Sequence, residues 1–152
     1  METVDLLDVA RECVERQKVN ARHSYISLTY LGESAPVTGS RVLLDELCQN
    51  LCDNAIRYNR PGGKVQIITA CTRDGHCTLT VKDNGIGIPK EAQTSVFERF
   101  YRVDKSRSKA TGGTGLGLAI VKHIARIHNA RIKLDSVVDE GTTITVIFET
   151  AS

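Results

Sequence analysis

The residues best suited to chemistry lie on a stretch with two carboxamides one helical turn apart, Asn50 and Asn54. Steps of three and four residues place helical side chains on one face, so both could act together with Arg57. Carboxamide oxygens suit a hard cation such as Mg2+, which keeps several waters and shares phosphate oxygens. A guanidinium suits phosphate, and the ring of Tyr58 offers a flat face on which a base can stack. The same face could equally be the solvated side of an ordinary amphipathic helix.

A second candidate is a carboxylate, Asp83, at the end of a row of apolar residues. Leu79, Val81 and Asp83 share parity in a predicted strand, so all three point to one face. A carboxylate among apolar side chains needs a partner, and the exocyclic amine of a base would serve. Alternatively, Asp83 caps the turn that follows it. In that turn Gly85 and Gly87 allow positive φ and a close approach of the backbone to a ligand.

A second glycine-rich segment, 113–117, opens a predicted helix that runs to about His128. Exposed N–H groups and the helix dipole favour anions at such a position. The preceding segment, 101–113, is basic and poor in apolar residues, which indicates either a flexible surface loop or a lid that closes over a phosphate chain. The glycines do not directly follow a strand, and the lysine-serine pair of a P-loop is missing, so neither of those two fingerprints applies.

Composition indicates one globular domain. The chain has 152 residues, of which 41% are hydrophobic and 25% charged. A net charge of +2 argues against a nucleic-acid partner. No apolar run is long enough to cross a bilayer and no signal peptide is visible, so we expect a cytoplasmic domain without membrane contact. The five cysteines form no Cys-x-x-Cys pair, so zinc binding has little support. Cys71 and Cys77 flank a predicted turn and could face each other, although a reduced protein is the simpler expectation.

The order of elements predicts the fold class. Helices are expected at 4–18, 41–58 and 113–128, with a short one at 91–100, and strands at 23–31, 64–72, 76–83, 131–138 and 142–149. Ser40 can cap the second helix, and 32–40 reads as a loop. Strands that alternate in polarity form a sheet with one face covered. We therefore predict the α+β class: a two-layer α/β sandwich with a mixed, mostly antiparallel sheet and three main helices on one face.

Four motifs, taken in order, resemble the N, G1, F and G2 boxes of sensor histidine kinases. They are Asn50-x-x-x-Asn54, Asp83-x-Gly85-x-Gly87, Phe97-Glu98-Arg99-Phe100-Tyr101-Arg102 and Gly113-x-Gly115-Leu116-Gly117-Leu118. The resemblance covers nearly the whole chain. It implies the Bergerat ATP-binding fold, shared with gyrase-type ATPases and related heat-shock chaperones, with a lid at about 97–113. It also implies ATP and Mg2+ as cofactors.

The resemblance assigns the phosphate side by position. Asn50 and Asn54 resemble the magnesium-side residues, and Arg57 resembles the basic phosphate contact. Arg102 and Arg107 resemble lid residues that reach the terminal phosphate, which makes Asn50 and Arg102 the catalytic candidates. In the gyrase-type hydrolases the place of Asn50 holds a glutamate that activates water. A carboxamide cannot act as a general base, so phosphoryl transfer is favoured over hydrolysis.

The remaining matched positions would surround the nucleotide. Tyr58 resembles the residue that packs on adenine, and Asp83 the carboxylate that accepts a hydrogen bond from the 6-amino group. The other positions implied to line the nucleotide are Gly85, Gly87, Ile88, Gly113, Gly115, Leu116, Gly117 and Thr142.

The phosphate acceptor is missing from the sequence. The family transfers phosphate to a histidine on a separate helical hairpin, and none of the four histidines here lies in that sequence box. The implied partner is the acceptor hairpin of the same kinase, with a response regulator involved indirectly. We expect residues 1–152 to be a single catalytic domain, monomeric by itself, without acceptor hairpin, sensor or membrane segment. Three alternatives stay open: an ATPase with Glu46 as its base, a serine kinase of the same fold, and a non-catalytic nucleotide-binding module.

Overall fold

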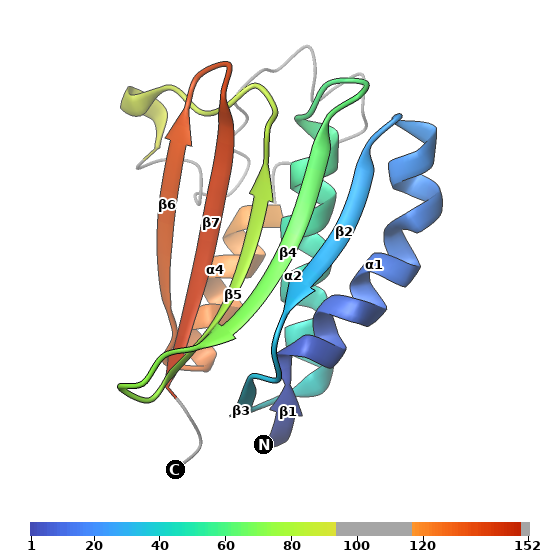
Figure 1. The fold of residues 1–152 in the computed structure, drawn as a ribbon. Coiled ribbons are helices and arrows are strands. Elements are labelled where there is room, and N and C mark those ends of the chain that lie inside the picture. Colours follow the sequence, from blue (N-terminus) through green and yellow to red (C-terminus); the bar gives the residue numbers. More distant parts are fainter. Residues whose placement is uncertain (94–116, 150–152) are drawn as a thin grey trace.

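A computed structural model of the chain describes residues 1–93 and 117–149. In this part, a five-stranded sheet carries the helices α1 (Leu6–His23), α2 (Arg41–Arg57) and α4 (Gly117–Ile127) on one face (Figure 1). The strand order is β2 (Ser27–Gly32), β4 (Lys64–Cys71), β5 (His76–Asp83), β7 (Gly141–Glu149) and β6 (Arg131–Val137). β2 runs parallel to β4, and the other neighbours are antiparallel. The predicted α+β sandwich with a mixed sheet is confirmed.

The core lies between the sheet and the helices. Alternate residues of the central strands point to the helical layer, as the period of two requires. The buried side chains of β5 and β7 are Cys77, Leu79, Val81, Thr142, Ile144, Val146 and Phe148. Opposite them, α2 buries its apolar stripe, which consists of Leu44, Leu47, Cys48, Leu51 and Ala55. Each large apolar side chain among them contributes about 1.5–3 kcal/mol on burial, so this layer fixes how α2 sits over the sheet.

The helix boundaries follow from caps and from the apolar stripe. Ser40 caps α2 as predicted, because its Oγ accepts a hydrogen bond from the Leu43 N–H at 3.3 Å. α1 is longer than predicted and ends at His23. The reason is that Ala21, one turn after the buried Gln17, continues the buried stripe beyond residue 18.

Some expectations were wrong at the edges. Residues 32–40 are not simply a loop, because β3 (Pro36–Gly39) pairs with β1 (Glu2–Asp5) in a separate two-stranded sheet. Four-residue strands that include a proline give almost no local signal. Along the predicted first strand, the exposed fraction of the side chains rises from 7% at Ile26 to 41% at Tyr30. The reason is that β2 is an edge strand with one neighbour. Of the short helix expected at 91–100, residues 94–100 lie outside the described part of the chain, and the residues before them contain a 3-10 turn at Lys90–Ala92.

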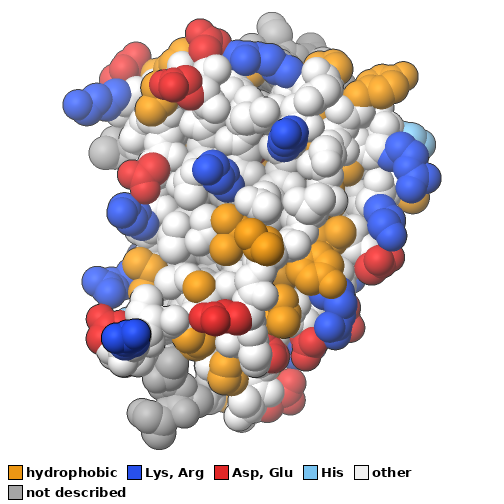
Figure 2. Space-filling model, viewed as in Figure 1, with side chains coloured by type: hydrophobic (Ala, Val, Ile, Leu, Met, Phe, Trp, Pro, Cys, Tyr) orange, Lys and Arg blue, Asp and Glu red, His pale blue; other side chains and the backbone are white. Residues whose placement is uncertain are grey.

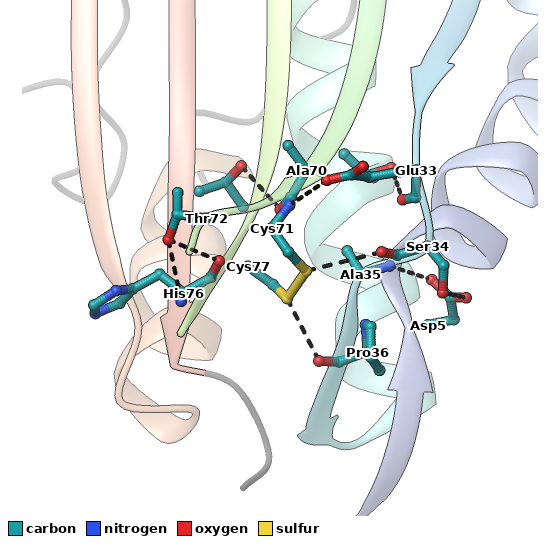
Figure 3. Close-up of a disulfide and its surroundings, with 12 residues drawn as sticks. Asp5, Glu33, Ser34, Ala35, Pro36, Ala70, Cys71, Thr72, His76 and Cys77 are labelled. Carbon is teal, nitrogen blue, oxygen red and sulfur yellow. Dashed lines mark hydrogen bonds between the residues drawn. A yellow bond between two sulfur atoms is a disulfide. The ribbon is translucent and has the colours of Figure 1, made fainter. Parts of the chain in front are cut away.

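A disulfide joins Cys71 to Cys77 near the end of the β4–β5 hairpin (Figure 3). The two residues are direct cross-strand partners, which brings their Cα atoms to 4.1 Å. Their sulfur atoms lie 3.8 Å from the Ser34 carbonyl oxygen and 3.6 Å from the Pro36 carbonyl oxygen, respectively. The prediction that this pair could face each other is confirmed, and the expectation of a reduced protein is wrong for it. The buried cysteines, Cys13, Cys48 and Cys52, are free thiols.

Reduction of this disulfide is expected to lower the free energy of unfolding by about 2 kcal/mol, because it releases a short closed loop in the unfolded chain. Denaturant unfolding with and without a thiol reductant measures the change. A Cys71→Ala/Cys77→Ala double variant is the control and should not respond to reductant. Equal midpoints for the wild type in both conditions would contradict the prediction.

The sheet face opposite the helices is open. Figure 2 shows basic and acidic side chains interspersed there with hydrophobic ones, so this face carries no field of a single sign. Among the described helices, none combines the length and the apolar character that a bilayer crossing requires.

Candidate functional site

One pocket collects most of the predicted residues. It is formed by α2, the end of β5 with the bend that follows, the start of α4, and β7. The predicted residues that line it are Asn50, Asn54, Arg57, Tyr58, Asp83, Gly87, Ile88, Gly117 and Thr142. The other lining residues were not predicted as site residues: Leu51, Asp53, Ala55, Val81, Ile86, Leu118 and Ile144. Arg102, Arg107, Gly113, Gly115 and Leu116 lie outside the described residues.

The bend after β5 is fixed to the end of α2. The Ile86 N–H donates to the Tyr58 carbonyl at 3.2 Å, next to the side chain expected to contact a base. Gly85 is buried, and a Cβ there would lie 2.5 Å from the backbone carbonyl oxygen of Tyr58. The glycine is therefore needed for this close approach, whereas the expected positive φ is found at Gly87 and not at Gly85. Asn59, only 4% exposed, donates from Nδ2 to the Lys64 carbonyl at 3.0 Å and ties the end of α2 to β4.

The β6–β7 hairpin holds the other side of the bend. The Ile88 N–H donates to the Ser136 Oγ at 2.8 Å, and the Asp139 N–H donates to the Ile86 carbonyl at 2.9 Å. Gln93 donates from Nε2 to the Ile88 carbonyl at 3.0 Å and to the Ser136 carbonyl at 3.1 Å. Sequence reasoning missed these positioning residues. The register of the last hairpin could have indicated Ser136, because that residue is the cross-strand partner of Thr142.

Asp83 points into the pocket with one oxygen already bonded. Its Oδ1 accepts from the Gly85 N–H at 2.9 Å and from the Thr142 N–H at 3.3 Å. Its Oδ2 accepts no hydrogen bond from any described residue. Burial raises the pKa of this carboxyl from an ordinary 3.8 to about 6, and the two backbone donors offset only part of that effect. Asp83 thus caps its turn and still keeps an acceptor for a ligand.

The polar wall is formed by α2. Asn50 donates from Nδ2 to the Glu46 carbonyl at 2.9 Å, which fixes the amide. Its Oδ1 lies 3.7 Å from the position of a Cβ on Gly117, the first described residue of α4. Arg57 pairs with Asp53 at 2.8 Å, and both side chains are about two-thirds buried or more. Amide oxygens suited to a hard cation and a guanidinium suited to phosphate therefore lie on the same wall.

The comparison with protein families identifies the fold family. Residues 39–152 match the family described as histidine kinase-, DNA gyrase B-, and HSP90-like ATPase. The chain belongs to this family, whose domains bind ATP. The resemblance noted in the sequence is thereby confirmed.

Curated relatives are sensor kinases. The sensor-like histidine kinase SenX3 of Mycolicibacterium smegmatis is 49% identical over 151 residues, which is 96% of this chain and 38% of that protein. The sensor histidine kinase YkoH of Bacillus subtilis is 40% identical over 149 residues, which is 97% of this chain and 32% of the relative. The chain thus spans less than two-fifths of the length of either relative.

Solved structures agree with these relatives. The mycobacterial sensor histidine kinase MprB superposes with a TM-score of 0.85 at 34% identity, covering 97% of each chain. The catalytic domain of the histidine kinase ThkA superposes with a TM-score of 0.82 at 24% identity and covers 99% of each chain, which supports the fold alone. The structure is that of a histidine kinase catalytic domain.

Proposed function

We propose that this pocket binds Mg-ATP and that the domain donates the γ-phosphate to a histidine on a separate helical hairpin in two-component signalling. This proposal rests on one pocket that is lined both by the amide face of α2 and by the part-buried carboxylate of Asp83. Its two ends have different chemistry. One offers Tyr58 and the Oδ2 of Asp83 to a base, and the other offers Asn50 and Asn54 to a cation.

The roles follow from those chemistries. Asp83 holds the adenine amine through Oδ2, and Thr142 keeps the carboxylate in place through its N–H. The oxygens of Asn50 and Asn54 would hold Mg2+, which neutralises phosphate charge when bound. Arg57 supplies a fixed positive charge on the same wall. Gly117 brings the N-terminus of α4 beside Asn50, where backbone N–H groups favour anions.

Transfer is favoured over hydrolysis. Catalysis of phosphoryl transfer depends mainly on positioning and on charge neutralisation, and Asn50 cannot take a proton from water. Glu46, the alternative base, is exposed and does not line the pocket in the described part of the chain. The proposed lid at about 97–113, with Arg102 and Arg107, completes the phosphate end.

The proposed setting is a cytoplasmic catalytic domain of a larger sensor kinase. Its direct partner is the acceptor hairpin of the same kinase, and a response regulator receives the phosphate afterwards. The domain itself is proposed to be a monomer.

Calorimetric titration with ATP tests whether Asn50 and Asn54 hold Mg2+. Asn50→Ala and Asn54→Ala are each expected to remove most of the increase in ATP affinity that Mg2+ gives, about tenfold or more, because a ligand oxygen is lost. Gln49→Ala is the matched control, since Gln49 is an exposed amide on the same helix and does not line the pocket. Equal responses to Mg2+ in all three variants would reject Asn50 and Asn54 as metal ligands.

Binding of the base is expected to depend on pH. Adenosine has no titrating phosphate, so its affinity should fall about tenfold for each pH unit below about 6, as the Asp83 carboxyl takes up its proton. Above that pKa the carboxylate is ionised and affinity should level off. Titrations between about pH 5 and 7.5 measure the profile, and Asp83→Asn should flatten it. A flat profile for the wild type would show that this carboxylate does not hold the base.

A further inference from the structure

The end of α1 contains a tyrosine where the backbone favours glycine. The Tyr25 N–H donates to the Arg22 carbonyl at 3.1 Å, and the Ile26 N–H donates to the Ala21 carbonyl at 2.9 Å. This pair of bonds defines a Schellman motif, whose left-handed position is usually glycine. Tyr25 occupies that position with φ +59°. A bulky residue there is disfavoured because its Cβ crowds the backbone.

The same motif at the end of α4 uses a suitable residue. Asn129 has φ +54°, and the matching bonds run from Asn129 to Arg126 at 3.2 Å and from Ala130 to Ala125 at 2.8 Å. Asparagine tolerates this conformation, so the turn itself does not need an aromatic residue. Tyr25 is 75% exposed, and packing inside the domain therefore does not compensate for the strain. A contact outside the domain would explain why the ring is there.

Tyr25 borders a second pocket that adjoins the nucleotide site. This pocket lies between the ends of α1 and α2, at the same end of the molecule as the bend after β5 (Figure 1). Its polar lining includes Asn20, His23 and Asn59. Asp53 and Arg57 line both this pocket and the nucleotide pocket, so their ion pair is a shared wall.

We propose that Tyr25 and the adjoining pocket form a docking surface for the helical hairpin that carries the acceptor histidine, an inference that rests on the proposed function. The acceptor must approach the nucleotide pocket from outside, and a hairpin seated here would lie against the wall formed by Asp53 and Arg57. More than half of the length of each relative lies outside the matched region, and that part is long enough to include such a hairpin. Exposed aromatic residues are typical energetic centres of interfaces. Val19, one helical turn before His23 and 58% exposed, extends the apolar part of the surface.

The test measures phosphoryl transfer from this domain to the acceptor hairpin of its kinase, supplied as a separate protein at increasing concentration. Tyr25→Gly is expected to raise the KM for the hairpin about tenfold, because an interface hot spot is lost. Its melting temperature should not fall, since glycine suits the backbone, and its ATP affinity should stay unchanged. Tyr25→Phe should keep a wild-type KM for the hairpin. Asn129→Gly is the matched control, with the same backbone change at the end of α4, and should leave transfer unaltered.

A wild-type KM for the hairpin in Tyr25→Gly would overturn the docking surface and leave the proposed function intact. An equal rise of that KM in Asn129→Gly would also overturn it, because the effect would then come from the helix end rather than from the ring. If the wild type binds ATP but transfers nothing to the hairpin, the proposed function fails and this surface falls with it.

Discussion

Replacing Asp83 with asparagine is expected to weaken ATP binding about 100-fold. The amide oxygen can still accept from the Gly85 and Thr142 N–H groups, as Oδ1 does now. The amide nitrogen would then take the place of Oδ2, so its N–H donor would face the N–H donor of the adenine amine. Loss of a hydrogen bond to a charged group and an unpaired buried donor together cost about 3 kcal/mol, which corresponds to about 100-fold in affinity. Calorimetry measures this directly, and unchanged affinity would remove Asp83 from the site.

The same substitution is expected to stabilise the ligand-free domain. The folded-state pKa of Asp83 is about 6 against an ordinary 3.8, so ionisation opposes folding. For an acid with a raised folded pKa, this penalty is absent below the unfolded value, grows as pH rises, and is complete above the folded value. Asp83→Asn should therefore gain about 1–3 kcal/mol in unfolding free energy near neutral pH and almost nothing near pH 4. Denaturant unfolding at both pH values tests the sign, with the exposed Asp135→Asn as a control that should show no gain.

Gly87→Ala is expected to destabilise the domain by about 3 kcal/mol or more. Gly87 has φ +73°, and a Cβ there would lie 2.2 Å from the Val137 carbonyl oxygen and 2.9 Å from the Val138 Cα. These neighbours are backbone atoms at the β6–β7 turn, so the clash can be relieved only if the hairpin moves away from the bend. The expected cost is that of overpacking plus backbone strain. Because the bend lines the nucleotide pocket, ATP affinity should fall as well.

Gly62→Ala is the matched control for Gly87→Ala. Gly62 has φ +87°, but beyond its chain neighbours no atom of the described residues lies within 4 Å of its added Cβ. This variant should lose only about 1 kcal/mol, the cost of the backbone conformation for a residue with a Cβ. The difference between the two midpoints in denaturant measures the contact with the hairpin. Equal losses in both variants would show that the close approach to Val137 does not matter.

The spacing of residues in the sequence predicted much of the site. The helical register placed Asn50, Asn54 and Arg57 on one face, and strand parity placed Asp83 at the end of an apolar row. The resemblance to sensor histidine kinases joined these residues and Thr142 in one expected site, and in the structure all five line one pocket. The spacing in the sequence corresponds to one face in the structure because each helix or strand buries one of its faces in the core.

Interactions between distant segments were not predictable in the same way. The contacts of Ser136 and Gln93 with the bend and the pairing of β1 with β3 depend on tertiary approach. Gly85 is the clearest example. The sequence explained this glycine by positive φ and by a close approach of the backbone to a ligand, whereas the structure requires it for the close approach to the Tyr58 carbonyl.

The proposed function requires this domain to transfer phosphate to a histidine rather than to water. Incubation with ATP labelled on the γ-phosphate, with and without the acceptor hairpin of its kinase, tests it most directly. The expected result is label on a histidine nitrogen of the hairpin and little free phosphate when the hairpin is absent. Rapid release of labelled phosphate by the domain alone, with none on the hairpin, would contradict it and identify the domain as a hydrolase.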